Sequence, residues 1–383
     1  MNKPRSRLLA SLEAAIKSAA NPIEAQCLRA ERAALLARQG QLERAQGVID
    51  ELNAQLAWQP GNTPLRAWLA LAEGLHGYYS VIGRDAQASV ERAYALAKDS
   101  GSAGARLRAT TAAWLANMAF NNDDEWPRMA ALVREAFDAA APEHRGARAR
   151  AALVAGYAYH FGGQAERGQR WYEASRRHAI AEGDEAHLSA LMHNQAWMRA
   201  SQARMALLFD AGARDDKAVT QALSSAVMSA ESIGHYDAGI GTASLGSLVP
   251  MLRAQVLTAQ GRWDEALALF DVNFDSALTE GLKRIAPCLL ADRAWCEWHL
   301  GRADKARALA GAAEQALAEP CDIDDRAMAL ARMAQVRDAL GETGTGAAHR
   351  SESTRLFETH RGQQQRIVAL LDQALGGIDP AKV

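Results

Sequence analysis

The sequence predicts an all-α protein built from a series of antiparallel helix pairs. Apolar residues recur at spacings of three and four, as in "LRAERAALLARQG" and "ALVREAFDAA", which is the period of an amphipathic helix. Only 10 prolines occur and β-branched residues are sparse, so little in the chain favours strands. Glycines also punctuate the chain at nearly regular distances, which indicates repeated structural units.

Composition and charge exclude several classes of protein. Of the 383 residues, 49% are hydrophobic and 23% are charged, which is typical of a folded chain. The net charge of −2 favours neither nucleic acid nor an anionic membrane as a partner. Four scattered cysteines without a CxxC pair favour a reducing compartment over a disulfide framework.

The N-terminal segment contains no long apolar stretch, because Glu13 and Lys17 interrupt it, so a signal peptide is not expected. No window approaches the roughly 18 uninterrupted apolar residues that suggest a membrane span. We therefore expect a cytoplasmic protein that binds neither nucleic acid nor membrane.

The period of the repeats follows from the punctuating residues. They lie 43, 41, 39, 98, 40 and 40 residues apart, so the unit is close to 40 residues. The single long interval holds two units and about 18 extra residues. In chain order, these residues are Gly40, Gly83, Asp124, Gly163, Gly261, Gly301 and Gly341.

Each unit carries the same local pattern around its glycine. Glycine between two helices permits the left-handed backbone that ends the first helix. A small residue five positions later lets the second helix approach the first closely, and a larger residue four further on fills the gap. The small residues are Ala45, Gly168, Ala266 and Ala306, and the larger ones are Ile49, Tyr172 and Phe270.

This pattern resembles the tetratricopeptide repeat (TPR) family, in which a small residue is followed four positions later by an aromatic one. The resemblance covers roughly residues 25–350, with helices longer than the family's usual ones, as in helical sensor regions of bacterial signalling proteins. It implies a right-handed superhelical array, an α-solenoid of about seven to eight repeats. An ordinary helical bundle with chance glycines is the alternative.

The resemblance also implies that the first helix of each pair lines a concave groove that holds ligands. Residues ten, six, three and two positions before each punctuating residue then face the groove, with the missing fifth glycine placed near Ala203. Packing between repeats, or a buried hydrogen-bonded histidine, is the alternative role for each residue taken singly. The candidate ligand-binding residues are Trp114, Asn121, Tyr157, His160, His193, Asn194, Trp197, Gln255, Trp295, Trp298 and His299.

The long interval indicates an irregular insertion within residues 203–247. Its segment "DAGIGTASLG" invites comparison with a phosphate-binding loop, because glycines allow a close backbone approach to an anion. No strand is expected before it and no lysine follows, so the comparison fails. We interpret the segment as a loop or helix bend near the groove.

Motifs for catalysis and metal binding are missing from the sequence. HExxH, GxSxG and CxxC do not occur. Cys288, Cys296 and His299 are close in sequence, but positions eight apart differ by about 80° around a helix. The acidic runs "NNDDEW" and "CDIDD" are typical of helix starts, where carboxylates cap exposed N–H groups. We therefore expect no enzymatic activity, no metal and no cofactor.

Residues 351–383 are expected to form a C-terminal helix outside the repeat array, continuing a polar helical pattern that begins near residue 346. Its apolar and intermediate positions follow a weak heptad, at Leu356, His360, Gln363, Ile367, Leu370 and Ala374. It resembles the helix that joins TPR sensor regions to output domains in bacterial diguanylate cyclases, although no GGDEF motif occurs in this sequence. A capping helix that covers the last repeat is the alternative.

Two functions remain open at the level of sequence. The first is a non-enzymatic binding module or scaffold that holds a peptide, a protein segment or a small ligand in the groove. The second is the sensor region of a bacterial signalling regulator, whose C-terminal helix couples to an output domain or partner.

Overall fold

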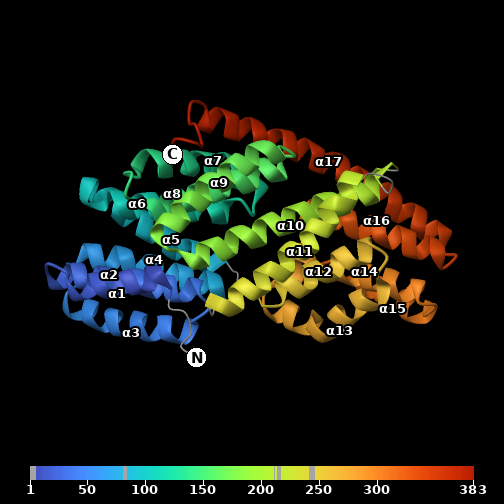
Figure 1. Ribbon diagram of the computed structural model, residues 1–383, viewed down its shortest axis with the longest axis horizontal. Coiled ribbons are helices and arrows are strands. Elements are labelled where there is room, and N and C mark those ends of the chain that lie inside the picture. The colour runs from blue at the N-terminus through green and yellow to red at the C-terminus, as the bar shows by residue number, and fades with distance from the viewer. Residues whose placement is uncertain (1–5, 81–83, 211, 214–216, 241–245) are drawn as a thin grey trace. The chain divides into compact units, whose positions relative to one another are not determined.

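A computed structural model describes residues 6–80, 84–210, 212–213, 217–240 and 246–383. These residues form α-helices, short 3₁₀ turns and connections, with no strand among them, as the sequence predicts (Figure 1). The α-helices are α1 (Arg7–Lys17), α2 (Pro22–Arg38), α3 (Leu42–Trp58), α4 (Thr63–Ser80), α5 (Arg84–Asp99), α6 (Ala105–Ala119), α7 (Trp126–Ala139), α8 (Arg145–Phe161), α9 (Ala165–Glu182), α10 (Glu185–Phe209), α11 (Lys217–Ile240), α12 (Leu248–Ala259), α13 (Trp263–Thr279), α14 (Ala286–His299), α15 (Ala303–Ala316), α16 (Ile323–Ala339) and α17 (Thr343–Leu375).

The chain divides into two compact units. Unit 1 comprises residues 1–191, 236–244 and 365–383, and unit 2 comprises residues 192–235 and 245–364. The helices α10, α11 and α17 each contribute residues to both units.

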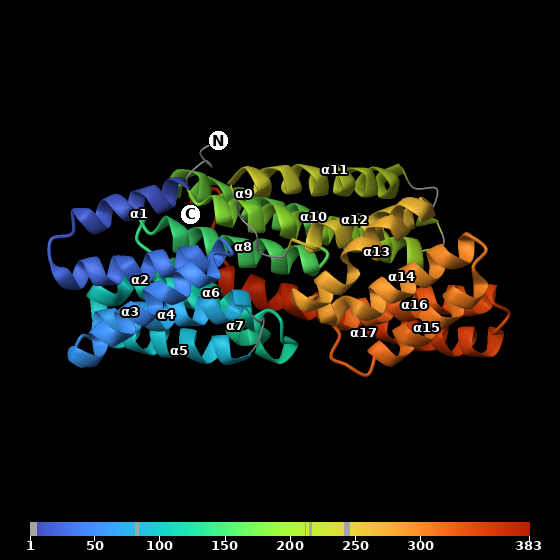
Figure 2. The same ribbon diagram turned by 90° about the horizontal axis from the view of Figure 1, so that it is seen from below.

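In unit 1, consecutive helices pack as neighbouring pairs, namely α2 with α3, α4 with α5, α6 with α7 and α8 with α9. The first helices also contact one another, α2 with α4 and α6 with α8. Figure 2 shows α2, α4 and α5 lying side by side. The main core of unit 1 is rich in alanine, and Leu65, Leu71 and Met129 are fully buried in it. Alanine lets helix axes approach closely, and the larger side chains fill the remaining space.

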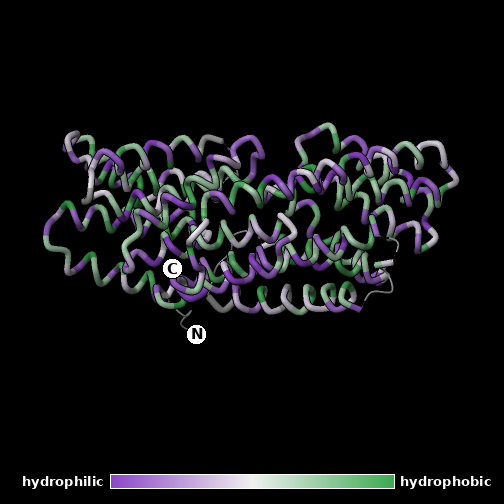
Figure 3. Tube along the Cα trace, turned by 90° about the horizontal axis from the view of Figure 1, so that it is seen from above, coloured by the Kyte–Doolittle hydropathy of each residue, from purple (hydrophilic) through white to green (hydrophobic). Residues whose placement is uncertain are grey.

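Unit 2 is built in the same way. Helix α12 packs against α13, α14 against α15, and the first helices α12, α14 and α16 contact one another in sequence. Phe270 and Leu289 are fully buried in the core between α12, α13 and α14. Figure 3 shows hydrophilic and hydrophobic residues interspersed along the helices, as expected for elements that bury one face.

The predicted role of the punctuating glycines is confirmed. Gly40, Gly163, Gly261, Gly301 and Gly341 all have φ between 73° and 80°, a left-handed conformation that favours glycine. At each of them, the residue after the glycine donates its N–H to the carbonyl five positions back, as Gln41 does to Leu36. This is the Schellman closure of a helix C-terminus. Gly83 lies outside the described residues, and Asp124 lies in the 3₁₀ turn Asp123–Glu125.

The predicted small positions are confirmed as well. Ala45, Ala266 and Ala306 are fully buried. At Gly168 a Cβ atom would lie 2.7 Å from the carbonyl oxygen of Gly156, so only glycine fits between α8 and α9 at this point. Close approach of the two helices of a pair therefore explains this part of the sequence pattern.

The expected turn near Ala203 is not formed, because α10 continues through it to Phe209 and Ala203 packs in a core with Ala196 and Ala200. Within residues 203–247, where we expected an irregular insertion, the structure has the end of α10 and the whole of α11. These helices have 25 and 24 residues, whereas α8 has 17, so the extra length of the long interval lies in two longer helices. Residues 241–245 of the glycine-rich segment lie outside the described residues.

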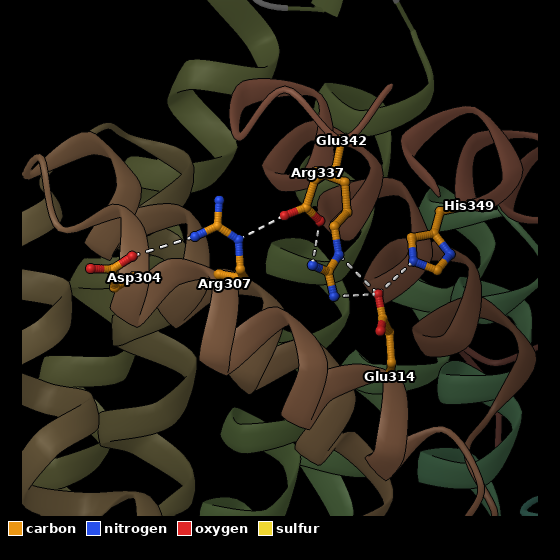
Figure 4. A network of polar contacts seen from close by, with 6 residues as sticks. All are labelled: Asp304, Arg307, Glu314, Arg337, Glu342 and His349. Carbon is orange, nitrogen blue, oxygen red and sulfur yellow. Dashed lines mark hydrogen bonds and ion pairs between the residues drawn. The ribbon is translucent and has the colours of Figure 1, made fainter. Parts of the chain in front are cut away.

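Helix α17 is held in unit 2 by a polar network at its start (Figure 4). Arg337 of α16 donates to Glu314 of α15 and to Glu342, at 2.8 and 2.6 Å. His349 of α17 contacts the same oxygen of Glu314 at 2.8 Å, and Arg307 donates to Glu342 at 2.7 Å. Further along α17, Leu356 and His360 are buried. The network and these buried side chains fasten the helix to α15 and α16.

The last part of α17 belongs to unit 1, where Ile367, Leu371 and Leu375 are buried in the main core. The buried stripe therefore follows the predicted heptad to Ile367 and then shifts by one residue, leaving Leu370 and Ala374 only partly buried. None of the helices in the described ranges combines the length and apolar character needed to cross a bilayer.

Candidate functional site

A cluster of buried and half-buried polar and aromatic side chains lies in unit 1, and it is termed the Arg150 cluster. Its members come from the first helices of consecutive pairs. They are Arg38 at the end of α2, Tyr78 and Tyr79 near the end of α4, Trp114 in α6, Arg150 in α8 and Asp184 before α10.

Asp184 is positioned by the start of α10. Its Oδ1 accepts the backbone N–H of His187 at 2.9 Å, as an N-cap residue does. The same carboxylate accepts from Nη2 of Arg38 at 2.8 and 2.7 Å, and the two side chains are only 4% and 13% exposed. Burial opposes the charged form of Asp184, but the charge of Arg38 and the hydrogen bonds from Arg38 and from the backbone N–H of His187 hold its pKa below the ordinary value of 3.8. Asp184 is therefore an anion paired with Arg38.

Arg150 differs from Arg38 in forming no ion pair with a carboxylate of the described residues. The residue is 6% exposed, and its guanidinium carbon lies 3.9 Å from the ring centroid of Trp114. Within the described part of the chain, Nε of Arg150 is sealed from solvent without a hydrogen bond, and no carboxylate forms an ion pair with this residue. Burial lowers the pKa of Arg150, and the neighbouring charge of Arg38 lowers it further, while the charge of Asp184 opposes these two effects without reversing them. Burying an ion costs several kcal/mol, whereas a cation–π contact contributes about 2 kcal/mol. The contact with Trp114 therefore offsets only part of the free energy needed to bury this guanidinium.

Three aromatic rings surround the arginines. Tyr78 and Tyr79 meet edge to face at 5.2 Å between centroids, and each meets Trp114 in the same way, at 6.0 and 6.2 Å. Both tyrosines are half-buried, whereas Trp114 is 4% exposed. Asn117 donates to the hydroxyl oxygen of Tyr78 at 3.4 Å, which leaves the proton of this hydroxyl available for another acceptor. The rings therefore supply flat apolar surface beside the two cations.

His187 adds no charge to the cluster. The hydroxyl of Ser175 donates its one proton to the carbonyl of Ala149 at 2.8 Å, so its contact of 2.7 Å with Nε2 of His187 requires a proton on that nitrogen. Burial holds the pKa of His187 well below its ordinary value. A neutral His187 leaves Arg38, Arg150 and Asp184 as the charges, with a sum of +1.

Unit 2 contains a second group of the same ingredients, termed the Asp292 cluster. Asp292 of α14 accepts from Nη2 of Arg204 at 2.8 Å and from Nε of Arg332 at 3.0 Å, and all three side chains are at most 9% exposed. With its amide oxygen turned toward Arg204, Gln255 accepts from both terminal nitrogens at 3.0 Å. Arg332 also donates to Gln335 at 2.7 Å and lies 5.5 Å from the ring of Trp295. Both guanidiniums therefore have protein acceptors.

Beside the Asp292 cluster, four aromatic side chains form a stack at the end of α14 and the start of α13. His299 stacks on Trp263 at 4.1 Å, and Trp295 stacks on Trp298 at 5.3 Å. Trp295 and Trp298 also pack against the small core between α14, α15 and α16. Burial, and then Arg332, lowers the pKa of His299. Packing between helix pairs accounts for this stack.

The candidate residues expected from sequence fall in several places. Trp114 belongs to the Arg150 cluster, Gln255 and Trp295 lie at the Asp292 cluster, and Trp298 and His299 lie in the aromatic stack. In unit 1, Tyr157 packs on Phe120 at 4.6 Å, His160 lies 6.0 Å from Tyr172, and Asn121 is exposed after the end of α6. In unit 2, His193, Asn194 and Trp197 are half-buried on α10, and Trp197 packs against two core clusters.

Most of the Arg150 cluster was not selected from the sequence, although two of its residues carry a signal there. Arg38 lies two positions before Gly40 and so meets the positional rule. Arg150 lies one turn before Leu153, which is ten positions before Gly163, so it extends the same stripe of α8. Tyr78, Tyr79 and Asp184 carry no comparable positional signal.

No protein-family model matches this chain, and no characterised protein matches it in sequence. Across the residues that the structure places, no group of three or more His, Cys, Asp or Glu side chains has a geometry suited to a metal ion. The arrangement around Arg150 therefore has to be interpreted from its own chemistry.

Proposed function

We propose that this chain is a non-enzymatic binding module, a TPR-like superhelix of helix pairs that holds an anionic group of its ligand against Arg150. The first helices of the pairs would line the concave face, and these helices carry the Arg150 cluster. The observation that supports the proposal most strongly is the buried guanidinium of Arg150, which has no carboxylate partner among the described residues.

The physical reason is the free energy of a buried charge. An anionic group placed against Arg150 would restore the pairing that burial removes, and the low local dielectric would make that pairing strong. Arginine presents a rigid fork of N–H donors that suits two oxygen atoms at once. The half-buried rings of Tyr78 and Tyr79 would contact the apolar part of the ligand.

The chemical character of the cluster favours binding over catalysis. Its carboxylate, Asp184, is committed to Arg38, and its imidazole, His187, is held neutral by burial and bonded to Ser175. Burial raises the pKa of Tyr78, so this phenol stays protonated at neutral pH. Such groups orient and neutralise a ligand, as in a recognition site.

The test is a titration of the purified protein with sodium benzoate, sodium benzenesulfonate and phenyl phosphate, followed by calorimetry. Arg150→Met removes the cation and keeps much of the volume, and we expect it to abolish the binding of every anion that the wild-type chain takes up. Arg170→Met, at an exposed position of α9 in the same unit, is the matched control and should bind normally. Unchanged binding by Arg150→Met with intact helical circular dichroism would contradict the proposal.

The sensor function has one observation in its favour, which is the continuous 33-residue helix α17. In a regulator, such a helix would transmit ligand binding to a partner. Leu356 is buried in one core of unit 2, and the main core of unit 1 buries Ile367, Leu371 and Leu375. We therefore favour a structural role for α17 over a role in signal transmission. Replacing its exposed residues Arg355 and Glu358 by alanine, with binding intact and regulation lost, would favour the sensor function.

A further inference from the structure

We infer that the group bound at the Arg150 cluster is a single carboxylate, carried on an apolar body, and not a phosphate dianion. This inference rests on the proposed function, because it specifies the ligand of the same site.

The first argument is the charge of the site. The two guanidiniums of Arg38 and Arg150 and the carboxylate of Asp184 sum to +1, and His187 is neutral. One negative charge on the ligand therefore neutralises the cluster. A second negative charge would face the 3% exposed Asp184 without compensation, and like charges in a low dielectric repel strongly.

The second argument is the number of hydrogen-bond donors. Nη2 of Arg38 already contacts both oxygens of Asp184, at 2.8 and 2.7 Å. Arg150 then supplies one planar fork, which matches the two oxygens of a carboxylate. The hydroxyl of Tyr78 accepts from Asn117 and can donate one further proton. A phosphate has three oxygens that need donors, and the cluster offers too few for it.

The third argument concerns the remainder of the ligand. The side chains beside Arg150 are the rings of Tyr78, Tyr79 and Trp114, whose centroids lie within 6.2 Å of one another. Flat apolar surface next to a charged fork suits a carboxylate attached to an apolar or aromatic group.

The experiment compares probes that share a phenyl ring and differ in charge and shape. At pH 8, benzoate is a planar monoanion, benzenesulfonate a tetrahedral monoanion, phenyl phosphate a tetrahedral dianion and benzamide neutral. Acetate and inorganic phosphate repeat the comparison without the ring. We expect benzoate to bind at least about tenfold more tightly than phenyl phosphate, with benzenesulfonate between them and benzamide not binding.

A charge substitution tests the same reasoning from the side of the protein. Asp184→Asn keeps the volume and the side-chain oxygen that caps α10, and it raises the charge of the cluster to +2. We expect the preference for benzoate over phenyl phosphate to fall by about tenfold in this variant. Circular dichroism and the melting temperature establish that the variant is folded. The comparison of probes on the wild-type chain does not depend on any variant.

The outcomes separate the two proposals. Phenyl phosphate binding as tightly as benzoate, or an unchanged preference in folded Asp184→Asn, overturns the carboxylate inference and leaves the anion-binding function standing. Failure of every anion in both probe series to bind the wild-type chain overturns the proposed function itself, and the carboxylate inference with it.

Discussion

The two arginine clusters contain the same ingredients in different states of pairing. Each has two buried or nearly buried arginines, one buried aspartate and one tryptophan under a guanidinium. In unit 2, Asp292 lies between Arg204 and Arg332 and pairs with both. In unit 1, Asp184 pairs with Arg38, whereas Arg150 lies over the ring of Trp114 and forms no ion pair with a carboxylate of the described residues. A carboxylate partner for each buried arginine indicates a structural role, whereas a buried arginine without one indicates a place for a ligand.

The largest expected effect comes from breaking the Asp292 cluster, in which both arginines pair with the carboxylate. Asp292→Ala leaves Arg204 and Arg332 buried without a carboxylate, and removing one partner of a buried ion pair typically costs about 3–5 kcal/mol. Urea denaturation followed by circular dichroism measures the loss. Arg150→Met is the matched comparison in unit 1, and it should leave the unfolding free energy unchanged or slightly higher, because no partner is orphaned. Equal losses in the two variants would show that Arg150 is already paired in the folded state.

The dependence of the unfolding free energy on pH is a smaller effect, and its sign is opposite in the two units. The folded pKa of Asp184 is depressed, since Arg38 outweighs burial, so its contribution to stability is present above the unfolded pKa and is lost as the pH falls below about 4. Burial, and then the charge of Asp324, raises the pKa of Asp325 in unit 2 well above its ordinary value. For this raised group, stability is lost as the pH rises through the folded pKa.

Hydrogen exchange of each unit between pH 3 and pH 8 measures these opposite trends. We expect protection in unit 1 to fall at the acid end, and Asp325→Asn to stabilise unit 2 at pH 8 by about 1 kcal/mol. Destabilisation of unit 2 by Asp325→Asn at pH 8 would mean that the ionised carboxylate is the favoured form there.

The smallest effect is expected at the exposed edge of the network of Figure 4, which also pairs arginines with carboxylates. Arg307 and Glu342 are 48% and 30% exposed, so water screens their ion pair. Arg307→Ala should therefore cost less than about 1 kcal/mol in unfolding free energy, and 0.5 M salt should reduce the difference further. A cost comparable to that of Asp292→Ala would show that exposure does not separate the two kinds of arginine network.

The sequence predicted the helical architecture in detail where the chemistry is local. Gly163 lies three positions after His160, whose carbonyl accepts the N–H of that glycine, and glycine alone adopts φ of 75° there without strain. Gly168 is small because the backbone of Gly156 faces it. The helix boundary near Ala203 was wrong, because no left-handed residue ends α10 there and packing with Ala196 and Ala200 continues the helix.

The sequence by itself determined which segments are helical, where glycine ends a helix and which positions are small, because these depend on neighbours within one or two turns. Only the tertiary structure decided which arginines are buried and which of them are paired. Arg38 finds its carboxylate 146 residues away and Arg204 finds its own 88 residues away, while Arg150 meets a tryptophan from the preceding helix pair. An arginine on a helix suits solvent, an ion pair or an aromatic ring equally well by its local sequence, and the side chains that distant helices bring to it select among them.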